Sequence, residues 1–348
     1  MVAKSLSALV LLVSVLSLLG LAANAAHTNQ AHNMSSIIQN KHMHGDVVVV
    51  QRNGHVIVYD AKNNTDLARG QALLSAFSKL RSGDTVYLAA ENYSIATGPF
   101  NVTYLSEAGA GGMLTGVKLL GAGKYKTRIY DTYLNYTLSY LALPPLVMTG
   151  CNSVTANLSL VSYDEPYSLW GTSDGYGGCL GNATLSNVYL QSDSFSRFGI
   201  YVNYTPSAEI VGNIIVRNAT INATGAAAYI KASPSLNAYF YNTNASASYL
   251  YGMPSTGILA SPFSTGGNIY LIDTTVSISN GYPGGVAVYD GGSASTYLYG
   301  SSALCGRCAG QLSLWNAGNM IAVNSTSVYN SLRSVGVITN IGPAKFKG

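Results

Sequence analysis

The chain has 348 residues, of which 48% are hydrophobic and only 9% are charged, and its formal net charge is +4. This length and hydrophobic content allow a sizeable core, whereas the scarcity of charge leaves little to solvate the outer faces of many helices. The basic residues form no run and no patch with interleaved aromatic residues, so the composition excludes a typical nucleic-acid-binding protein.

Residues 1–25 have the pattern of a signal peptide. Lys4 precedes an apolar run from Leu6 to Leu21, and Ala23-Asn24-Ala25 has the small-x-small form of a signal-peptidase site. The alternative is an uncleaved membrane anchor, but the run is shorter than the ~20 residues of a spanning helix. We therefore predict an extracellular or cell-surface protein with no membrane span after cleavage.

Residues 26–45 are polar and without periodicity, and they contain four histidines. One interpretation is a copper- or nickel-binding arm, since imidazole suits both metals. The alternative is a flexible tether. The candidate metal ligands are His27, His32, His42 and His44.

Residues 46–84 predict a hairpin followed by a helix. Two Val-rich runs, 47–50 and 56–59, flank Asn53-Gly54, and Asn-Gly is a strong signal for a tight hairpin turn. The helix is expected from Thr65 or Asp66 to about residue 81. Its apolar face is expected to consist of Leu67, Leu74, Phe77 and Leu80.

From residue 85 to about 345 short strand-like runs alternate with turn residues, and one pattern occurs four times. A Gly-Asn pair opens each copy, and an Asn or Asp follows six residues after the Gly. This repetition predicts the stacked coils of a parallel β-helix. The two sets are Asn182, Asn213, Asn268 and Asn319, and Asn187, Asn218, Asp273 and Asn324.

Each of these two sets is expected to form a ladder of hydrogen-bonded side chains between coils. The alternative is a simple preference of Asn and Gly for left-handed turns. A second repeat is formed by residues 248–252 and residues 296–300, both of which end in Tyr-Leu-Tyr-Gly. We expect these two segments to lie two coils apart.

The segment from the helix to residue 130 resembles the pectin-lyase-like superfamily of right-handed parallel β-helices. The resemblance rests on the helix followed by Gly83-Asp84-Thr85-Val86, and on Gly121-Ala122-Gly123 before Thr127-Arg128-Ile129. It implies an all-β, right-handed parallel β-helix whose helix covers the open N-terminal end. These motifs mark a fold and identify no catalytic family.

The superfamily includes polysaccharide lyases, glycoside hydrolases and non-catalytic surface proteins, so the acidic residues need separate consideration. A catalytic interpretation makes the arginine of one cluster a base or substrate clamp and its acids ligands of Ca²⁺ or activators of water. The alternative is solvated turn charges, and then no cofactor is expected. The cluster comprises Asp164, Glu165, Asp174, Asp193 and Arg197.

No histidine follows His55, so the β-helix body lacks a Ser-His-Asp triad. Tyrosine, in contrast, is abundant, with 26 residues. Pairs spaced Tyr-x-Tyr place two rings on one strand face, where they could bind sugars, although Tyr also pairs well across any sheet. The candidate sugar-binding residues are Tyr239, Tyr241, Tyr249 and Tyr251.

The four cysteines and the glycosylation motifs follow from the expected export. Cys151 and Cys179 are about one coil apart and are expected to form a disulfide, as are Cys305 and Cys308. For the second pair, a redox dithiol or half of a zinc site is the alternative.

Twelve Asn-x-Ser/Thr motifs are candidate glycan sites. Asn182, Asn218 and Asn324 belong both to this set and to the expected ladders. Because an asparagine cannot be both buried and glycosylated, these three should be unmodified if the ladders form. The twelve are Asn33, Asn63, Asn92, Asn101, Asn135, Asn157, Asn182, Asn203, Asn218, Asn222, Asn244 and Asn324.

The sequence therefore predicts a secreted or cell-surface β-helix that is structural or glycan-binding and N-glycosylated. Its expected partners are polysaccharides or cell-surface glycans. The alternative function is a polysaccharide lyase or glycoside hydrolase that acts on an acidic polysaccharide.

Overall fold

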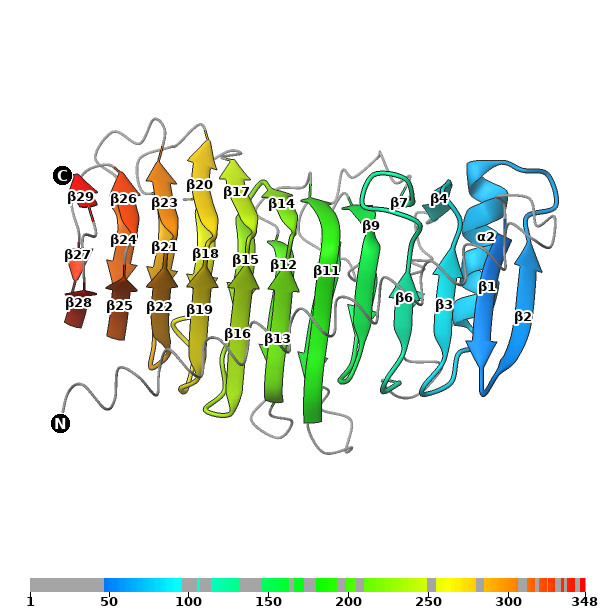
Figure 1. Cartoon of the computed structure of the whole chain (residues 1–348), viewed down its shortest axis with the longest axis horizontal. Helices are drawn as coiled ribbons and strands as arrows, with labels where there is room; N and C mark the ends of the chain where they lie inside the picture. The colour runs from blue at the N-terminus through cyan, green and yellow to red at the C-terminus, as the bar shows by residue number, and fades with distance from the viewer. Residues whose placement is uncertain are drawn as a thin grey trace. The chain divides into compact units, whose positions relative to one another are not determined.

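The computed structural model describes residues 47–95, 105–106, 114–131, 146–162, 166–171, 180–192, 198–204, 210–248, 255–279, 285–305, 312–316, 319–323, 325–328, 333–334, 337–341 and 345–347. Within them the chain forms a parallel β-solenoid, in which each coil adds strands to the preceding one (Figure 1). The predicted all-β solenoid is thus confirmed.

The strands of successive coils stack in three parallel ladders, named here by their order along a coil. The first ladder consists of β3 (Thr85–Leu88), β6 (Lys118–Leu120), β9 (Val154–Ser162), β11 (Leu180–Ser192), β13 (Val211–Arg217), β16 (Leu236–Tyr241), β19 (Asn268–Ile272), β22 (Ser295–Tyr299), β25 (Asn319–Val323) and β28 (Val337–Ile341).

The second ladder is continuous with the first, because β9 and β11 run through both. Its other members are β4 (Asn92–Ile95), β7 (Arg128–Asp131), β14 (Thr220–Ala223), β17 (Asn244–Ser248), β20 (Thr275–Ser279), β23 (Ser302–Cys305), β26 (Thr326–Val328) and β29 (Lys345–Lys347).

The third ladder forms a separate sheet. It consists of β5 (Leu105–Ser106), β8 (Val147–Thr149), β10 (Tyr167–Gly171), β12 (Phe198–Tyr204), β15 (Ala226–Ile230), β18 (Thr256–Ala260), β21 (Val286–Asp290), β24 (Leu312–Asn316) and β27 (Arg333–Ser334).

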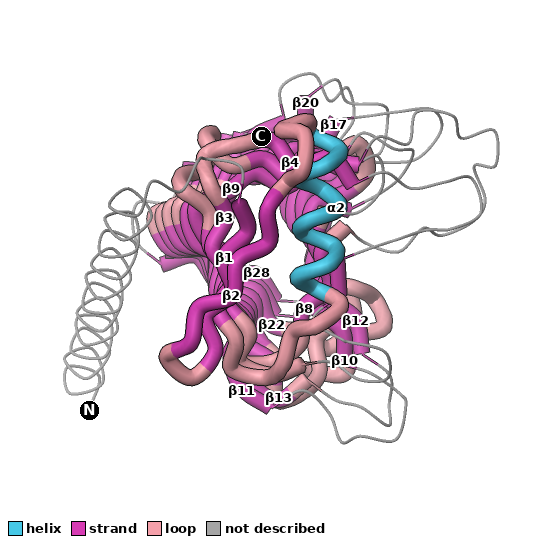
Figure 2. The backbone as a smooth tube through the Cα atoms, turned by 90° about the vertical axis from the view of Figure 1, so that its right-hand side faces the viewer, coloured by secondary structure: helices cyan, strands magenta, loops and turns pink. Residues whose placement is uncertain are grey.

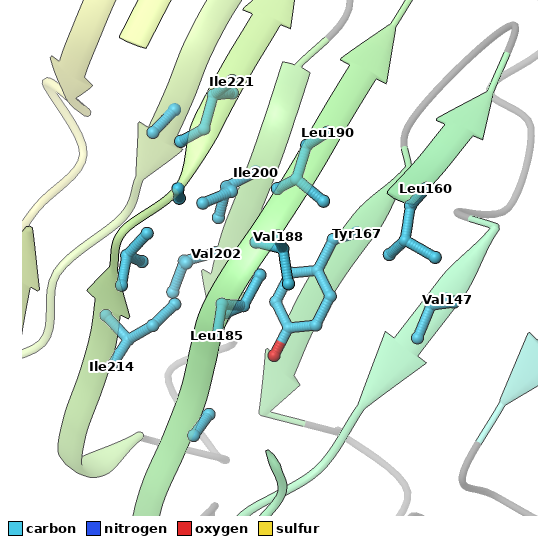
Figure 3. Close-up of a cluster of buried hydrophobic side chains, with 14 of the residues drawn as sticks. Val147, Leu160, Tyr167, Leu185, Val188, Leu190, Ile200, Val202, Ile214 and Ile221 are labelled. Carbon is cyan, nitrogen blue, oxygen red and sulfur yellow. The ribbon is translucent and has the colours of Figure 1, made fainter. Parts of the chain in front are cut away.

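Alternating side chains point into the solenoid and form its core. On β16, for example, Ala238 and Phe240 are buried, whereas Tyr239 and Tyr241 between them are half-buried and face outward. Figure 3 shows aliphatic side chains of successive coils packed around Tyr167. The Tyr167 hydroxyl lies 2.6 Å from Thr149 Oγ1, which satisfies a polar group inside this apolar interior.

The predicted hairpin is confirmed as β1 (Val47–Arg52) and β2 (His55–Asp60), joined at Asn53 and Gly54. Both turn residues have positive φ, 47° and 82°, as a two-residue hairpin turn requires. Because β1 pairs antiparallel with β3, the hairpin covers the backbone edge of the first coil.

Helix α2 (Asp66–Phe77) begins at the predicted N-cap, where Thr65 Oγ1 accepts a hydrogen bond from the Ala68 backbone N–H. It ends before residue 81, because the last helical hydrogen bonds tighten into i,i+3 turns that bury Leu80. Figure 2 shows the helix beside β4, against which it packs.

The predicted apolar face of this helix is wrong at Leu67, which is 49% exposed, while Leu73 is fully buried. The reason is the close approach at Gly70, where a Cβ atom would lie 1.7 Å from the Ser94 carbonyl oxygen of β4. This contact turns Leu73 and Phe77, rather than Leu67, toward the core.

A partly buried ion pair joins the hairpin to the first coil. Arg52 Nε lies 2.8 Å from Asp84 Oδ1, and Asp84 is 1% exposed. The same guanidinium donates to the Lys79 carbonyl beyond the end of α2. The hydrogen bonds to Asp84 raise the pKa of Arg52, so this group stays charged.

The Gly-Asn repeat also has a structural cause. Gly181, Gly212 and Gly267 have φ of 118°, 141° and 83°, values that only glycine adopts readily. A Cβ atom on Gly212 would lie 2.1 Å from the carbonyl oxygen of Gly181 on the preceding coil. The glycines thus turn the chain into the first ladder at each of these coils.

The repeated segments 248–252 and 296–300 do not occupy equivalent positions in their coils. Thr296 to Tyr299 lie on β22 in the first ladder, whereas Ser248 ends β17 in the second. The structural counterpart of Tyr297 and Tyr299 is the Tyr239-Phe240-Tyr241 segment of β16, because both pair with β19.

Candidate functional site

The tyrosine side chains on the outer surface of the first ladder form a continuous aromatic group over three successive coils. We define the tyrosine strip as Tyr239, Tyr241, Tyr270, Tyr297 and Tyr299. These residues come from β16, β19 and β22, which lie side by side (Figure 1). All five side chains are half-buried and lie at outward positions of their strands.

The rings of the strip stack on one another along the solenoid. The ring centroids of Tyr239 and Tyr270 are 4.7 Å apart with planes 7° from parallel, and those of Tyr270 and Tyr297 are 4.8 Å apart at 13°. Tyr241 stacks on Tyr239 within its own strand, at 5.9 Å and 5°. The ring separation matches the spacing of strands in a sheet.

This stacking changes the expected mode of sugar binding. The two faces of the Tyr270 ring are covered by Tyr239 and Tyr297, so they are not available to stack on a sugar. The ring edges and hydroxyl groups remain available for contacts. The strip can therefore offer a row of hydrogen-bonding phenols rather than a set of stacking platforms.

The hydroxyl groups of the strip have no hydrogen-bond partner within the described part of the chain. Burial raises the pKa of Tyr239, Tyr241 and Tyr299, and burial together with the neighbouring tyrosines raises that of Tyr270 to about 12. These phenols therefore stay protonated at neutral pH, so each can both donate and accept a hydrogen bond.

The aromatic cluster on the third ladder differs in this respect. Phe198, Tyr201 and Tyr229 also contact one another, with ring centroids 4.9–5.2 Å apart. However, the Tyr229 hydroxyl lies 2.7 Å from Ser261 Oγ, and the Tyr201 hydroxyl accepts a bond from Asn203 Nδ2. Its polar groups are therefore already used within the protein.

Arg217 adds a positive charge beside the strip. It lies on β13 directly opposite Tyr241 of β16, and it makes no ion pair within the described residues. Its Nε is buried without a hydrogen-bond partner, and burial lowers the pKa of the guanidinium. A carboxylate from outside the protein would supply the missing opposite charge.

A column of asparagine amides runs along the first ladder near the start of its strands and reaches the strip at β16 and β19. Asn213 Nδ2 donates to Asn182 Oδ1 at 2.8 Å, Asn237 donates to Asn213 at 3.3 Å, and Asn268 donates to Asn237 at 2.9 Å. We call this set the amide column. The first predicted ladder is thus confirmed from Asn182 to Asn268, with Asn237 as a member that the repeat pattern missed.

The amide column ends after Asn268, because Ser295 stands opposite it on β22 and separates it from the predicted member Asn319. Asn237 escaped the sequence analysis because Leu236, not Gly, precedes it. The amides therefore flank the strip at β16 and β19 but not at β22.

The second predicted ladder follows the corner between the first and second ladders. Asn187, Asn218 and Asp273 all have φ near 50° there, as does Asn242, which the pattern missed. Asn242 Nδ2 donates to Asn218 Oδ1 at 2.9 Å, and Asn187 Nδ2 donates to Asn157 Oδ1 at 2.8 Å. The left-handed turn is thus confirmed, whereas each amide hydrogen bond joins a predicted member to an asparagine that the pattern missed, and none joins two of the described predicted members.

Several predicted site residues lie outside the described part of the chain. They include the whole acidic cluster with its arginine and the four histidines of the N-terminal segment, so the catalytic and metal-binding interpretations stay predictions. These residues are Asp164, Glu165, Asp174, Asp193, Arg197, His27, His32, His42, His44, Tyr249, Tyr251, Cys179 and Cys308, and the ladder residue Asn324 lies outside as well.

Among the cysteines, Cys151 is 3% exposed and is not a free thiol. Its neighbour Asn152 accepts a bond from the Asn182 backbone N–H through Oδ1, so this point of the chain contacts the coil that follows residue 179. Cys305 ends β23. The pairing of all four cysteines stays a prediction.

Within the described ranges, no three His, Cys, Asp or Glu side chains gather closely enough to hold a metal ion. No helix in the described part is long and apolar enough to span a membrane.

No family model, curated protein or solved structure matches this chain. The similarity to pectin-lyase-like proteins therefore rests on the sequence motifs and on the solenoid architecture alone.

Proposed function

We propose that the chain is an exported, N-glycosylated and non-catalytic β-solenoid that binds an acidic polysaccharide along the tyrosine strip. The observation that carries this proposal is the row of phenol hydroxyls beside Arg217, which have no hydrogen-bond partner among the residues that the structure describes. Sugars present hydroxyl groups in a linear array, which matches hydrogen-bonding groups repeated at every strand. The carboxylate of a uronic acid would pair with the guanidinium.

Export is supported by the signal-peptide pattern of residues 1–25. The amide column extends the same surface, because its carbonyl and amino groups lie at the start of the strands that carry Tyr239 and Tyr270. The catalytic alternative, with or without Ca²⁺, depends on residues 164–197, and no described contact favours it.

Replacing Tyr270 and Tyr297 together by Phe tests the proposal. Phe preserves the stacked rings and removes two hydroxyl groups, each worth about 0.5–1.5 kcal/mol as a hydrogen bond. We expect Kd for alginate or polygalacturonate to rise about tenfold, with an unchanged melting temperature. Titration calorimetry with defined oligosaccharides would measure it.

Two comparisons make this test specific. Tyr125→Phe removes a phenol from a turn residue that is 73% exposed, and it should leave binding unchanged. Arg217→Gln should weaken binding to uronic-acid polymers and reduce its salt dependence. Equal binding of neutral dextran, or release of unsaturated or reducing sugars from the acidic polymers, would contradict the proposal.

A further inference from the structure

Two asparagines in glycosylation motifs stand at the accepting ends of side-chain amide columns. Asn182 accepts from Asn213 at 2.8 Å, and Asn218 accepts from Asn242 at 2.9 Å. Neither donates its own Nδ2 to another described residue. Both residues are exposed, so the expectation that ladder asparagines are buried is wrong for these two.

The direction of the hydrogen bonds separates the motif residues from the others. The five asparagines whose Nδ2 donates within the two ladders are Asn187, Asn213, Asn237, Asn242 and Asn268. None of them is followed by Ser or Thr at the second position. Within the two ladders, the described asparagines that lie in motifs therefore accept and do not donate, whereas the motif residues Asn203 and Asn222 elsewhere donate their Nδ2 to tyrosine hydroxyls.

We propose that Asn182 and Asn218 carry N-linked glycans while they serve as the terminal acceptors of their columns. This inference rests on the export included in the proposed function. Asn157 is a third accepting end within a motif, but it is half-buried and is not included.

The chemistry leaves the columns intact. The glycan donor is an oligosaccharide linked to a lipid diphosphate, as the export pathway supplies it. The Asn Nδ2 forms a bond to the first sugar carbon and loses one proton, while the sugar–phosphate bond breaks and releases the lipid diphosphate. The carbonyl oxygen Oδ1 takes no part, so it still accepts from Asn213 or Asn242.

The same reaction at an asparagine inside the amide column would disturb the fold. The Nδ2 of Asn213 lies 2.8 Å from Asn182 Oδ1, and its strand is about 4.8 Å from the next one. A sugar on this nitrogen would collide with the neighbouring asparagine of the column. At the accepting ends, Asn152 lies beside Asn182 and Asn187 lies beside Asn218 on the preceding coil, but neither Asn182 nor Asn218 donates its Nδ2 to a described residue, so no hydrogen bond of the column is lost when this nitrogen carries a sugar.

The test is a glycan map of the full-length chain secreted from a eukaryotic host. Enzymatic deglycosylation in heavy-oxygen water converts each modified Asn into labelled Asp, which peptide mass spectrometry locates. We expect labelling at Asn182 and Asn218. Thr184→Ala, which destroys only the first motif, should remove the Asn182 label and leave the fold unchanged.

An engineered motif provides the matched control. Ile215→Thr creates Asn-x-Thr at the donating Asn213, and glycosylation there should at least halve the secreted yield. A second measurement on unmodified Ile215→Thr protein from bacteria separates the glycan effect from that of the substitution. If Asn213 carried a glycan without loss of yield, the steric argument would be overturned.

The remaining outcomes separate this inference from the proposed function. Glycans at Asn63, Asn92 or Asn244 with none at Asn182 and Asn218 would overturn the inference alone. A secreted chain without any glycan would overturn both the inference and the glycosylation part of the proposed function. Polysaccharide binding is measured on unglycosylated protein and stands or falls independently.

Discussion

The carboxyl group of Asp290 lies at the inner side of β21 with no exposed surface. Neither of its oxygens has a hydrogen-bond partner within the described residues. Burial raises the pKa of Asp290 from 3.8 to about 7, and nearby Thr296 opposes this shift only in part. The folded chain thus holds a proton that the unfolded chain releases near pH 4.

This difference predicts that stability falls as pH rises. The contribution of Asp290 is fully present below about pH 4 and is lost progressively up to about pH 7, by at most about 4 kcal/mol. Asp290→Asn should remove this loss, so its advantage over the wild type grows between pH 4 and 7. Urea unfolding at several pH values measures it.

Asp273→Asn is the comparison, because Asp273 occupies an exposed corner. This variant should retain the pH dependence of the wild type. If Asp290→Asn had the same pH profile as the wild type, a charge-neutral Asp290 in the core would be ruled out.

At the scale of elements, the docking of α2 on β4 depends on the missing side chain of Gly70. Gly→Ala within a helix normally stabilises by about 1 kcal/mol. Here we expect Gly70→Ala to destabilise by about 2–3 kcal/mol, because the helix must move away from the Ser94 carbonyl. Ser75→Ala, on the exposed side of the helix, should change stability by less than about 0.5 kcal/mol.

Thermal unfolding of both variants distinguishes the two effects. A stabilised Gly70→Ala protein would show that the helix does not pack closely on β4.

At the scale of the whole molecule, β2 leaves an apolar edge at the hairpin end of the sheet. Val56, Ile57 and Val58 are 51%, 37% and 40% exposed, and within the described residues β2 pairs only with β1. Such an edge promotes pairing with other chains, and this strand contains no Lys or Pro to prevent it. The molecule should therefore self-associate at high concentration.

We expect Ile57→Lys to reduce this association, as measured by sedimentation velocity over a concentration series. The matched control is Val211→Lys, because Val211 is 38% exposed but β13 is paired on both sides. An equal effect of the two substitutions would indicate general hydrophobic association rather than edge pairing.

The solenoid itself was predictable because its cause is local. A backbone turn with positive φ followed by an outward amide recurs in three described coils, at Gly181, Gly212 and Gly267. The chain enters β16 and β22 without this pair, because Leu236 precedes Asn237 and Ser295 replaces the Asn, so the pattern missed these two coils.

The tyrosine strip was only half predictable, since it depends on register between coils. Tyr239 and Tyr241 were identified from their spacing. Tyr270 has no Tyr two residues away, and it joins the strip because β19 pairs in register with β16 and β22. The repeated Tyr297-Leu298-Tyr299 segment was noticed, but it was aligned with the wrong strand.

The same stack gives the protein an internal optical probe. Phenol rings held parallel at 4.7 and 4.8 Å interact electronically, so their near-ultraviolet circular dichroism depends on the alignment of β16, β19 and β22. Such a signal disappears when packing is lost even if secondary structure survives. Local opening of these coils can therefore be observed in the unlabelled chain, separately from unfolding at the hairpin end.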